Sequence, residues 1–318
     1  MRVAQGEDVR VLILLPVLNE ASLIARCIES VRSQSHANWL LVCQDNNSED
    51  STFSQVKSIS DEDDRVIIEK LTSQVSVSEN WESLARKSLI LYESDFVCWL
   101  AGDDFWSKTD YLTKLIGAMQ STNAGIASPC FQIVSPEEKV VQNSFCVNLE
   151  GSTKLQRIWS LLRDWSGTYV IYSLYRRREF EKIFFQGGAL SEYSGSDWWW
   201  SYFAILDCEV INVSNVDFYK TLWPRERRKS FSERTKNTGL IDQVIDILRR
   251  GFINWKDQAN LFRDHIIRER ARMKIINDWT LIIVVPYFLA KTIYQTLRFP
   301  ITQMSLKYKA IKRERVLN

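Results

Sequence analysis

Short apolar runs alternate with amphipathic segments through the first hundred residues of the chain. Their length and composition are typical of strands buried on both faces of a sheet. These runs are Val9–Leu15, Trp39–Cys43, Arg65–Ile68 and Phe96–Leu100. Between the first two, Ile24, Ile28 and Val31 recur at helical spacing, and a second helix is expected over Asn80–Tyr92. This alternation predicts an α/β domain with a Rossmann-like, mostly parallel sheet flanked by helices.

The pattern then becomes mixed. Lys108–Gln120 is expected to form a helix, and Ala124–Val134 a strand that pairs with Val140–Val147 as a hairpin. An amphipathic helix is expected over Ser152–Arg163, and the β-branched and aromatic residues of Thr168–Tyr175 favour a further strand. We therefore expect one large domain over residues 1–235.

Polar side chains follow the apolar runs at the points where the predicted strands end. Asn19 and Glu20 follow the first, Asp45 the second, and Asp103 and Asp104 the last. The carboxyl ends of parallel strands meet at one edge of a sheet, which is where open α/β sheets bind ligands. Adjacent carboxylates repel unless a cation or a set of donors holds them, and a divalent cation with a diphosphate would do so. The alternative is an ordinary turn after a strand.

Composition excludes several classes of protein. The 318 residues carry a net charge of +2, so no strong field favours nucleic acid. The six cysteines form no C-x-x-C pair, which favours reduced, core-filling thiols in the cytosol. His36 and His265 lack metal-spaced partners, so a histidine-based zinc site or catalytic triad is not expected. Residues 1–8 are too polar for a secretory signal.

Four segments together carry a family resemblance. They are Pro16-Val17-Leu18-Asn19-Glu20, the run from Asp45 to Thr52, Asn80-Trp81, and the run from Trp99 to Trp106. In this order and spacing they resemble the signatures of family 2 glycosyltransferases, which have the GT-A fold. The resemblance implies transfer of a sugar from a nucleotide-sugar donor, with inversion at the anomeric carbon, to a glycan or lipid-linked acceptor. It also implies a Mg²⁺ or Mn²⁺ ion that bridges the donor diphosphate.

The resemblance carries over to single residues. Asp103 and Asp104 take the place of the family's metal-binding acids, while Ala101 stands where many members have a further aspartate. A carboxylate at Asp45 could accept the imide N–H of uracil, which favours UDP-sugars. Asn80 could instead cap its helix. The residues expected to bind the donor are Pro16, Asn19, Glu20, Asp45, Asn80, Asp103, Arg225 and Arg228.

The general base is expected at Asp197, which precedes Trp198–Trp200 and resembles the family's acidic residue on the acceptor side. An inverting transfer needs a base to take the proton of the attacking hydroxyl. The alternative role of Asp197 is to cap the following helix. At least one of the three tryptophans is expected to pack in the core, because consecutive residues cannot share one helix face.

Arg225 and Arg228 belong to a basic run that is expected to neutralise the departing diphosphate, the alternative being a solvated charge run. Residues 236–318 are expected to form a helical extension. Its segment Thr280–Ala290 is too short to span a bilayer, but with the basic tail after it could anchor the chain on an anionic cytoplasmic leaflet. The alternative is a helix that packs on the catalytic domain or in a dimer.

These observations predict a metal-dependent, inverting glycosyltransferase of the hexosyltransferase type. It is expected in the cytoplasm or peripherally on the inner face of the membrane, and the family resemblance implies a part in the assembly of a surface polysaccharide or glycolipid. A nucleotidyltransferase is less favoured, because the loop Pro16–Glu20 lacks its Gly-rich basic sequence. A catalytically impaired sugar-nucleotide binding protein is the other alternative, given Ala101 and the basic run of Arg225 and Arg228, which lacks the histidine that in many relatives reaches the metal.

Overall fold

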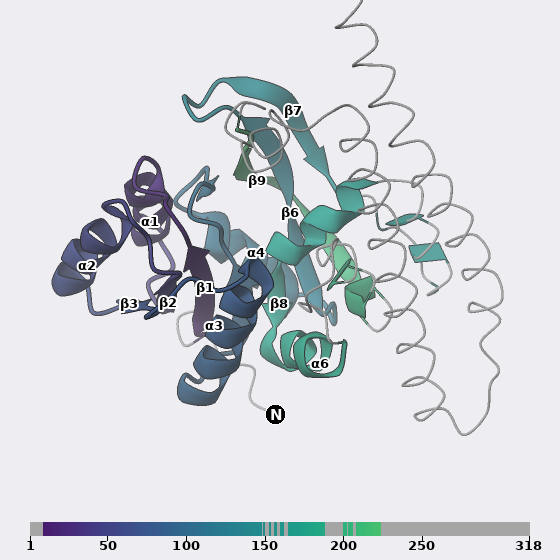
Figure 1. Ribbon diagram of the computed structural model, residues 1–318. Helices are drawn as coiled ribbons and strands as arrows, with labels where there is room; N and C mark the ends of the chain where they lie inside the picture. The colour runs from purple at the N-terminus through teal and green to yellow at the C-terminus, as the bar shows by residue number, and fades with distance from the viewer. Residues whose placement is uncertain are drawn as a thin grey trace, which may run out of the picture. The chain divides into compact units, whose positions relative to one another are not determined.

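The computed structural model describes residues 9–147, 165–187 and 208–223 (Figure 1). It also describes residues 149, 153, 156–157, 160–161, 200–201 and 203–205. By internal contacts the chain divides into two units, residues 1–224 and 225–318, and every described residue belongs to the first. The predicted helical extension therefore lies outside the described residues, and the expected boundary after residue 235 stays a prediction.

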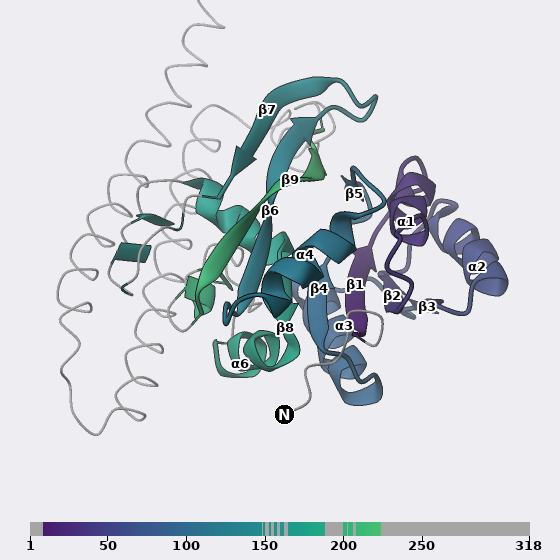
Figure 2. The same ribbon diagram turned by 180° about the vertical axis from the view of Figure 1, so that it is seen from behind.

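The first half of the sheet is parallel, as predicted. Strand β1 (Val11–Val17) lies between β2 (Trp39–Asp45) and β4 (Phe96–Trp99), and β3 (Val66–Lys70) extends the sheet beyond β2 (Figures 1 and 2). All residues of β1, β2 and β4 are buried. Strands of uninterrupted apolar residues are stable here because both faces of the sheet are covered. The predicted strand ends at Leu15, but β1 continues through Pro16 to Val17.

Helices follow the first strands in the expected alternation. They are α1 (Ile24–Arg32), α2 (Thr52–Glu62), α3 (Val77–Leu91) and α4 (Tyr111–Gln120). Helix α1 buries Ile24, Ile28 and Val31, the residues that the helical spacing had selected. Helix α3 begins before the predicted Asn80. Ser76 and Glu79 form a capping box there, which satisfies backbone N–H groups at the N-terminus of the helix.

The second half of the sheet is mixed. After β4 the order of strands is β8, β6, β9 and β5, with β7 paired to β6. These elements are β5 (Phe105–Trp106), β6 (Ile126–Val134), β7 (Val140–Cys146), β8 (Leu174–Arg176), β9 (Val210–Thr221) and helix α6 (Arg177–Gly187). β9 runs beside β6, so its end, Thr221, pairs with Val134. This brings the C-terminal end of β9 to the loop between β4 and β5, since β9 also pairs with β5.

The prediction of a strand over Thr168–Tyr175 is wrong. A 3₁₀ helix, η1, covers Trp165–Tyr172, and only Leu174–Arg176 joins the sheet as β8. The hydroxyl of Tyr175 donates to the backbone oxygen of Val170 at 2.5 Å, and both residues are buried. The pattern had indicated burial correctly, but β-branched and aromatic residues mark a buried surface as readily as a strand.

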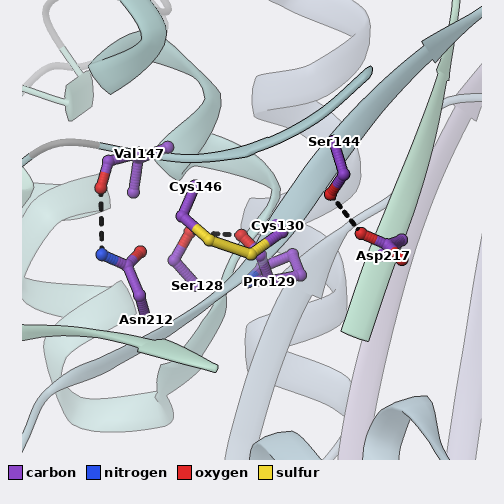
Figure 3. The surroundings of a disulfide bond; sticks show 8 residues. All are labelled: Ser128, Pro129, Cys130, Ser144, Cys146, Val147, Asn212 and Asp217. Carbon is purple, nitrogen blue, oxygen red and sulfur yellow. Dashed lines mark hydrogen bonds between the residues drawn. A yellow bond between two sulfur atoms is a disulfide. The ribbon is translucent and has the colours of Figure 1, made fainter. Parts of the chain in front are cut away.

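The prediction that all cysteines are reduced is wrong for two of them. Cys130 on β6 and Cys146 on β7 form a disulfide, with their Cα atoms 4.2 Å apart (Figure 3). The antiparallel register of the hairpin places them directly opposite each other, which no short sequence spacing reveals. The remaining four cysteines, Cys27, Cys43, Cys98 and Cys208, keep reduced thiols and are buried, as expected.

Aromatic side chains fill the core between η1, α6 and the sheet. Trp200 is fully buried, and its indole Nε1 donates to the hydroxyl of Tyr175 at 2.9 Å. The expectation that one tryptophan of Trp198–Trp200 packs in the core is thus confirmed. Across the part of the chain that the structure describes, no helix has both the length and the apolar character to cross a membrane.

Candidate functional site

Two loops meet at the carboxyl ends of β1 and β2, where Val17 pairs with Asp45. The backbone N–H of Asn19 donates to the Ser48 hydroxyl at 2.9 Å, and the Glu49 N–H donates to Asn19 Oδ1 at 2.9 Å. The backbone N–H of Glu20 donates to Thr52 Oγ1 at 2.8 Å. These reciprocal bonds join the loops of Asn19 and Glu20 to the start of α2.

Asn19 and Asn47 each adopt a left-handed backbone conformation, with φ of 56°. Asparagine tolerates this region better than most residues because its short amide can bond locally. Asn19 does so through the Glu49 N–H described above. Asparagine at this position is therefore explained by the loop conformation, and a donor contact by Asn19 stays a prediction.

The carboxylate of Asp45 is completely buried at the end of β2. Its Oδ2 accepts the backbone N–H of Ser48 at 3.0 Å, its Oδ1 accepts the Ser48 hydroxyl, and Lys70 Nζ lies 3.9 Å from Oδ2. Asp45 therefore fixes the loop that holds Asn19. The predicted contact of Asp45 with uracil stays a prediction.

Asn80 lies in the first turns of α3 and is buried, not a helix cap. The Gln44 amide donates to Asn80 Oδ1 at 2.8 Å and to its backbone oxygen at 3.0 Å. Nearby, Asn46 exchanges two hydrogen bonds with the backbone of Val75, at 2.9 and 3.0 Å. The segment before α3 is thus fastened to the end of β2, beside the predicted site.

The loop after β4 lies against the loop that follows β1. A Cβ on Gly102 would lie 2.9 Å from Val17 Cγ1 and 3.0 Å from Glu20 Cγ, so only glycine permits this approach. The thiol of Cys27 donates to the backbone oxygen of Ala101 at 3.3 Å. The loops that carry Glu20, Asp45 and Asp103 therefore adjoin at one edge of the sheet, as their sequence positions predicted.

Asp104 is fully buried, and the protein uses both of its oxygens. Oδ1 accepts the backbone N–H of Thr221 at 2.9 Å, and Oδ2 accepts from Lys220 Nζ at 2.7 Å. The hydroxyl of Tyr172 lies 3.3 Å from the same ammonium, which also lies 4.6 Å from the centre of the Tyr172 ring. Asp104 thus forms a buried ion pair with the end of β9.

Three residues that are distant in the chain donate hydrogen bonds to Asp103. Its Oδ2 accepts the indole N–H of Trp223 at 2.9 Å. Its backbone oxygen accepts from the Thr221 hydroxyl and from Arg26 Nη2, the latter at 3.3 Å. Arg26 also lies 4.2 Å above the Phe105 ring and pairs with Glu138 at 3.0 Å. The acidic loop is therefore held between α1 and the end of β9.

The charges in this cluster shift the pKa values of its members. Burial raises the pKa of Asp104 to about 7, with Lys220 opposing the shift and Asp103 adding to it. Burial acts to lower the pKa of Lys220, but Asp104 and the other negative groups outweigh it and raise that pKa well above its ordinary value. Burial and then the charge of Asp104 raise the pKa of the Cys27 thiol. Lys220 is thus charged throughout the physiological range.

The metal role of Asp103 and Asp104 stays a prediction. Among the described residues, no group of three or more His, Cys, Asp or Glu side chains could hold an ion. The predicted site is a smaller one, because it is a pair of carboxylates that would act together with diphosphate oxygens. Asp104 accepts hydrogen bonds from Lys220 and Thr221, and Ala101 supplies no ligand.

Sequence reasoning missed three residues of this cluster: Arg26, Lys220 and Trp223. A usable signal existed only for Lys220, since a lysine directly after Phe218-Tyr219 in a strand needs an acidic partner when it is buried. The predicted base Asp197 and the predicted donor ligands Arg225 and Arg228 lie outside the described residues. Pro16 is buried within β1 and pairs with Gln44.

Solved structures share the fold of this chain. Residues 1–349 of TarS from S. aureus match with a TM-score of 0.55 at 14% identity, covering 80% of this chain and 82% of that one. A mannosyltransferase from Pyrobaculum calidifontis, solved with GDP-Man and Mn²⁺, matches with a TM-score of 0.52 at 14% identity, covering 97% and 78%. The chain therefore has the GT-A fold.

The family comparison matches residues 12–184, more than half of the chain, to "Glycosyl transferase family 2". The protein belongs to this family, as the sequence motifs indicated.

Two curated relatives are glycosyltransferases. The chain is 24% identical over 200 residues to glycosyltransferase GlyA of Streptococcus pneumoniae, which covers 58% of this chain and 27% of that protein. It is 30% identical over 131 residues to an Escherichia coli enzyme, UDP-Glc:alpha-D-GlcNAc-diphosphoundecaprenol beta-1,3-glucosyltransferase WfgD, covering 41% and 48%. The chain thus spans less than half the length of either relative.

Proposed function

We propose that this protein transfers a sugar from a nucleotide-sugar donor, a UDP-sugar in particular, to a glycan or lipid-linked acceptor with inversion at the anomeric carbon. The observation that carries the proposal is the junction of three loops, those of Glu20, Asp45 and Asp103, at the carboxyl edge of a family 2 sheet. This edge is where open α/β sheets bind nucleotides.

The preference for uridine is supported by two findings. TarS has been solved in complex with UDP-GlcNAc, and WfgD is named for UDP-Glc. Asp45 and Asn46 are polar residues at the end of β2 whose side chains are held by hydrogen bonds, which suits recognition of a base by hydrogen bonds. WfgD is also named for a diphosphoundecaprenol-linked acceptor. This supports the proposals that the acceptor here is lipid-linked and that the protein acts peripherally at a membrane.

In the proposed reaction, groups of the protein bind and orient the donor, and one of them removes the proton of the acceptor hydroxyl. Asp103 and the loop around Asn19 and Glu20 position the nucleotide. Asp197 takes the proton from the attacking acceptor hydroxyl, whose oxygen bonds to the anomeric carbon as the bond to the diphosphate breaks. Arg225 and Arg228 neutralise the departing diphosphate. A Mg²⁺ or Mn²⁺ ion would be held by Asp103 and Asp104 and would supply positive charge at the diphosphate.

The test is a transfer assay with UDP-, GDP- and dTDP-sugars and sugar-diphosphate-lipid acceptors. We expect UDP release that depends on the acceptor, and NMR of the product should show an inverted anomeric configuration. Asp197→Asn should lower the turnover at least ~100-fold while leaving UDP affinity within about twofold, because a base acts on the acceptor. Asp64→Asn, at an exposed turn before β3, is the matched control and should leave turnover unchanged.

Two outcomes would decide against the proposal. Nucleotide binding with no transfer to any acceptor would favour the alternative of a sugar-nucleotide binding protein. Tight binding of GDP or dTDP instead of UDP would overturn the donor assignment at Asp45.

A further inference from the structure

A buried glutamine, Gln44, occupies the end of β2 beside the proposed donor site. It is 3% exposed, and its side-chain amide reaches α3, where Asn80 is 4% exposed. Gln44 Nε2 lies 2.8 Å from Asn80 Oδ1, 3.0 Å from the backbone oxygen of Asn80 and 2.6 Å from Ser83 Oγ. A buried polar side chain needs such hydrogen bonds to offset its lost hydration. Gln44 is therefore fastened to the start of α3.

The partners of Gln44 fix the orientation of two amides. A backbone oxygen only accepts hydrogen bonds, so the nitrogen of the Gln44 amide, and not its oxygen, must face the backbone oxygen of Asn80. That nitrogen carries only donors, and the Asn80 side chain must therefore present its oxygen to it, as observed. The nitrogen of Asn80 is then at the end of the amide that does not face Gln44. An apolar side chain at position 44 would not distinguish the two ends.

The Asn80 amide nitrogen keeps two N–H groups to satisfy. Among the residues that the structure describes, no oxygen accepts from Asn80 Nδ2, and this atom keeps contact with solvent although the residue is buried. An amide N–H without an acceptor costs free energy, so water or a ligand must accept there. A ligand group that accepts hydrogen bonds is complementary to this atom, whereas a group that donates them is not.

The position of Asn80 favours contact with the base of a nucleotide over contact with its diphosphate. Its partner Gln44 adjoins Asp45, which is proposed to accept the imide N–H of uracil, whereas Asp103 follows β4, and β1 separates β4 from β2. Successive residues of a strand point to opposite faces of a sheet, so Asp45 and Asn80 flank the end of β2 from its two faces.

Uracil carries a carbonyl oxygen on each side of its imide N–H. O2 adjoins the ribose, which continues to the diphosphate, and O4 lies on the side of the ring away from it. Since Asn80 is joined to β2, away from the acidic loop of Asp103, O4 is the oxygen assigned to it. Uracil would then offer an acceptor to Asn80 beside the donor that it offers to Asp45.

We infer that Gln44 is a positioning residue for base recognition: it orients the Asn80 amide so that Nδ2 donates to O4 of uracil, which favours uridine over cytidine nucleotides. The inference rests on the proposed function in that the ligand is the nucleotide of a sugar donor. Cytosine has an amino group in place of O4, so it would meet the N–H groups of Asn80 with further donors. Its N3 also lacks the proton that Asp45 would accept.

The experiment measures the Kd of UDP and of CDP by calorimetry for full-length proteins: wild type, Gln44→Met, Asn80→Ala, the double variant Gln44→Met/Asn80→Ala, and Gln34→Met. Methionine is similar in length to glutamine but donates no hydrogen bond. Gln34 is the matched control, because it is also a buried glutamine whose Nε2 donates to two oxygens, those of Ser30 at 2.9 Å and Lys108 at 2.8 Å. It connects α1 to the segment before α4.

Wild type should bind UDP at least ~100-fold more tightly than CDP, because a site built on hydrogen bonds rejects an analogue that leaves them unpaired. Gln44→Met should weaken UDP binding about 5- to 10-fold, which corresponds to one neutral hydrogen bond. It should not weaken CDP binding, because the released Asn80 amide can turn its oxygen to the amino group of cytosine. Gln34→Met should leave the ratio of the two affinities within about twofold of wild type.

The double variant separates positioning from a merely structural role. In the Asn80→Ala background, adding Gln44→Met should change the UDP Kd by less than about twofold, because Gln44 acts only through Asn80. In the transfer assay, Gln44→Met should raise the KM for the UDP-sugar and leave kcat within about twofold, since base contacts are equal in the ground and transition states.

Asn80→Asp provides a second test, which also decides the inference if Gln44→Met does not fold. An aspartate keeps one oxygen for the Gln44 nitrogen and replaces the two outward N–H groups by a second oxygen. Its preference for UDP over CDP should therefore fall at least ~10-fold relative to wild type.

An unchanged ratio of UDP to CDP affinity in Gln44→Met or Asn80→Asp would overturn the inference. So would an equal change of that ratio in Gln34→Met, or a further loss of UDP affinity when Gln44→Met is added to Asn80→Ala. None of these results touches the proposed function if sugar transfer proceeds. A wild type that prefers UDP as expected but transfers no sugar would instead sink the proposed function alone, and a protein that binds no nucleotide would overturn both.

Discussion

Lys220 Nζ lies 2.7 Å from the carboxylate of Asp104, although the two residues are 116 positions apart in the chain. This pair links β9 to the loop after β4 that carries Asp103 and Asp104. It also explains why two adjacent acids can sit at the end of a buried strand, since the second is neutralised within the protein.

Removing the cation should destabilise the fold strongly. Lys220→Met leaves the Asp104 carboxylate buried without its partner, so we expect a loss of ~3–5 kcal/mol in the free energy of unfolding. The double variant Lys220→Met/Asp104→Asn removes the unpaired charge and should recover part of this loss. Urea denaturation measures both.

The matched control for Lys220→Met is Lys57→Met on α2. Lys57 pairs with Asp61, and both side chains are exposed. Its cost should stay within about 1 kcal/mol, because exposed pairs contribute little. Equal costs for Lys57→Met and Lys220→Met would contradict a buried ion pair at Asp104.

Gly102 permits the close approach of two loops, so Gly102→Ala should disturb the site. The added methyl would lie 2.9 Å from Val17 Cγ1 and 3.0 Å from Glu20 Cγ, and overpacking of this kind costs ~1–3 kcal/mol. UDP affinity, measured by calorimetry, should fall at least ~10-fold. Gly117→Ala is the control: it lies within α4 with nothing inside 4 Å, so it should stabilise the fold by about 0.5–1 kcal/mol.

Asp63 should contribute stability that depends on pH. Its oxygens accept from Arg65 at 2.8 and 2.9 Å, and this pairing, with a smaller contribution from Arg32, lowers the pKa of Asp63 to about 2 from an ordinary 3.8. A depressed pKa means that the contribution is full above about pH 4 and is lost as pH falls toward 2.

Asp63→Asn should therefore cost about 1 kcal/mol at neutral pH, a figure reduced because Arg65 is partly exposed. The difference between the two proteins should shrink as urea titrations move to about pH 2. A difference that stays constant between neutral pH and pH 2 would show that the amide loses packing instead of charge.

The disulfide of the β6–β7 hairpin should contribute measurable stability. Cys130 and Cys146 close a loop with a sequence separation of 16, for which chain entropy predicts about 3 kcal/mol. Cys130→Ser/Cys146→Ser should lose roughly this amount under oxidising conditions. Reductant should lower the wild-type stability to that of the variant and leave the variant unchanged; identical stability of the wild type with and without reductant would argue against the bond.

The parallel half of the fold could be predicted from sequence because its strands are uninterrupted apolar runs. Leu14 and Val97 lie on strands that are buried on both faces of the sheet, so their burial follows from the apolar composition of those strands. The gathering of Glu20, Asp45 and Asp103 was predictable for a related reason, since each follows a parallel strand.

What the sequence could not give is the pairing of that edge with later parts of the chain. The contacts of Asp104 with Lys220, and of Asp103 with Trp223, join segments more than a hundred residues apart. They depend on β9 lying beside β6 and β5, and no local pattern specifies that register. The sequence could therefore indicate the two acids but not Lys220 and Trp223, the partners that the protein supplies for them.

The position of β1 between β2 and β4 sets an order of events during synthesis. The loops of Asn19 and Asp45 can form soon after two strands have left the ribosome, but β4 must add to the far side of β1 about fifty residues after β2 ends at Asp45. Until then one edge of the first strand has no partner and is open to pairing with another nascent chain. A ribosome-bound fragment that ends before Phe96 should therefore need a chaperone, whereas one that extends past Trp106 should not.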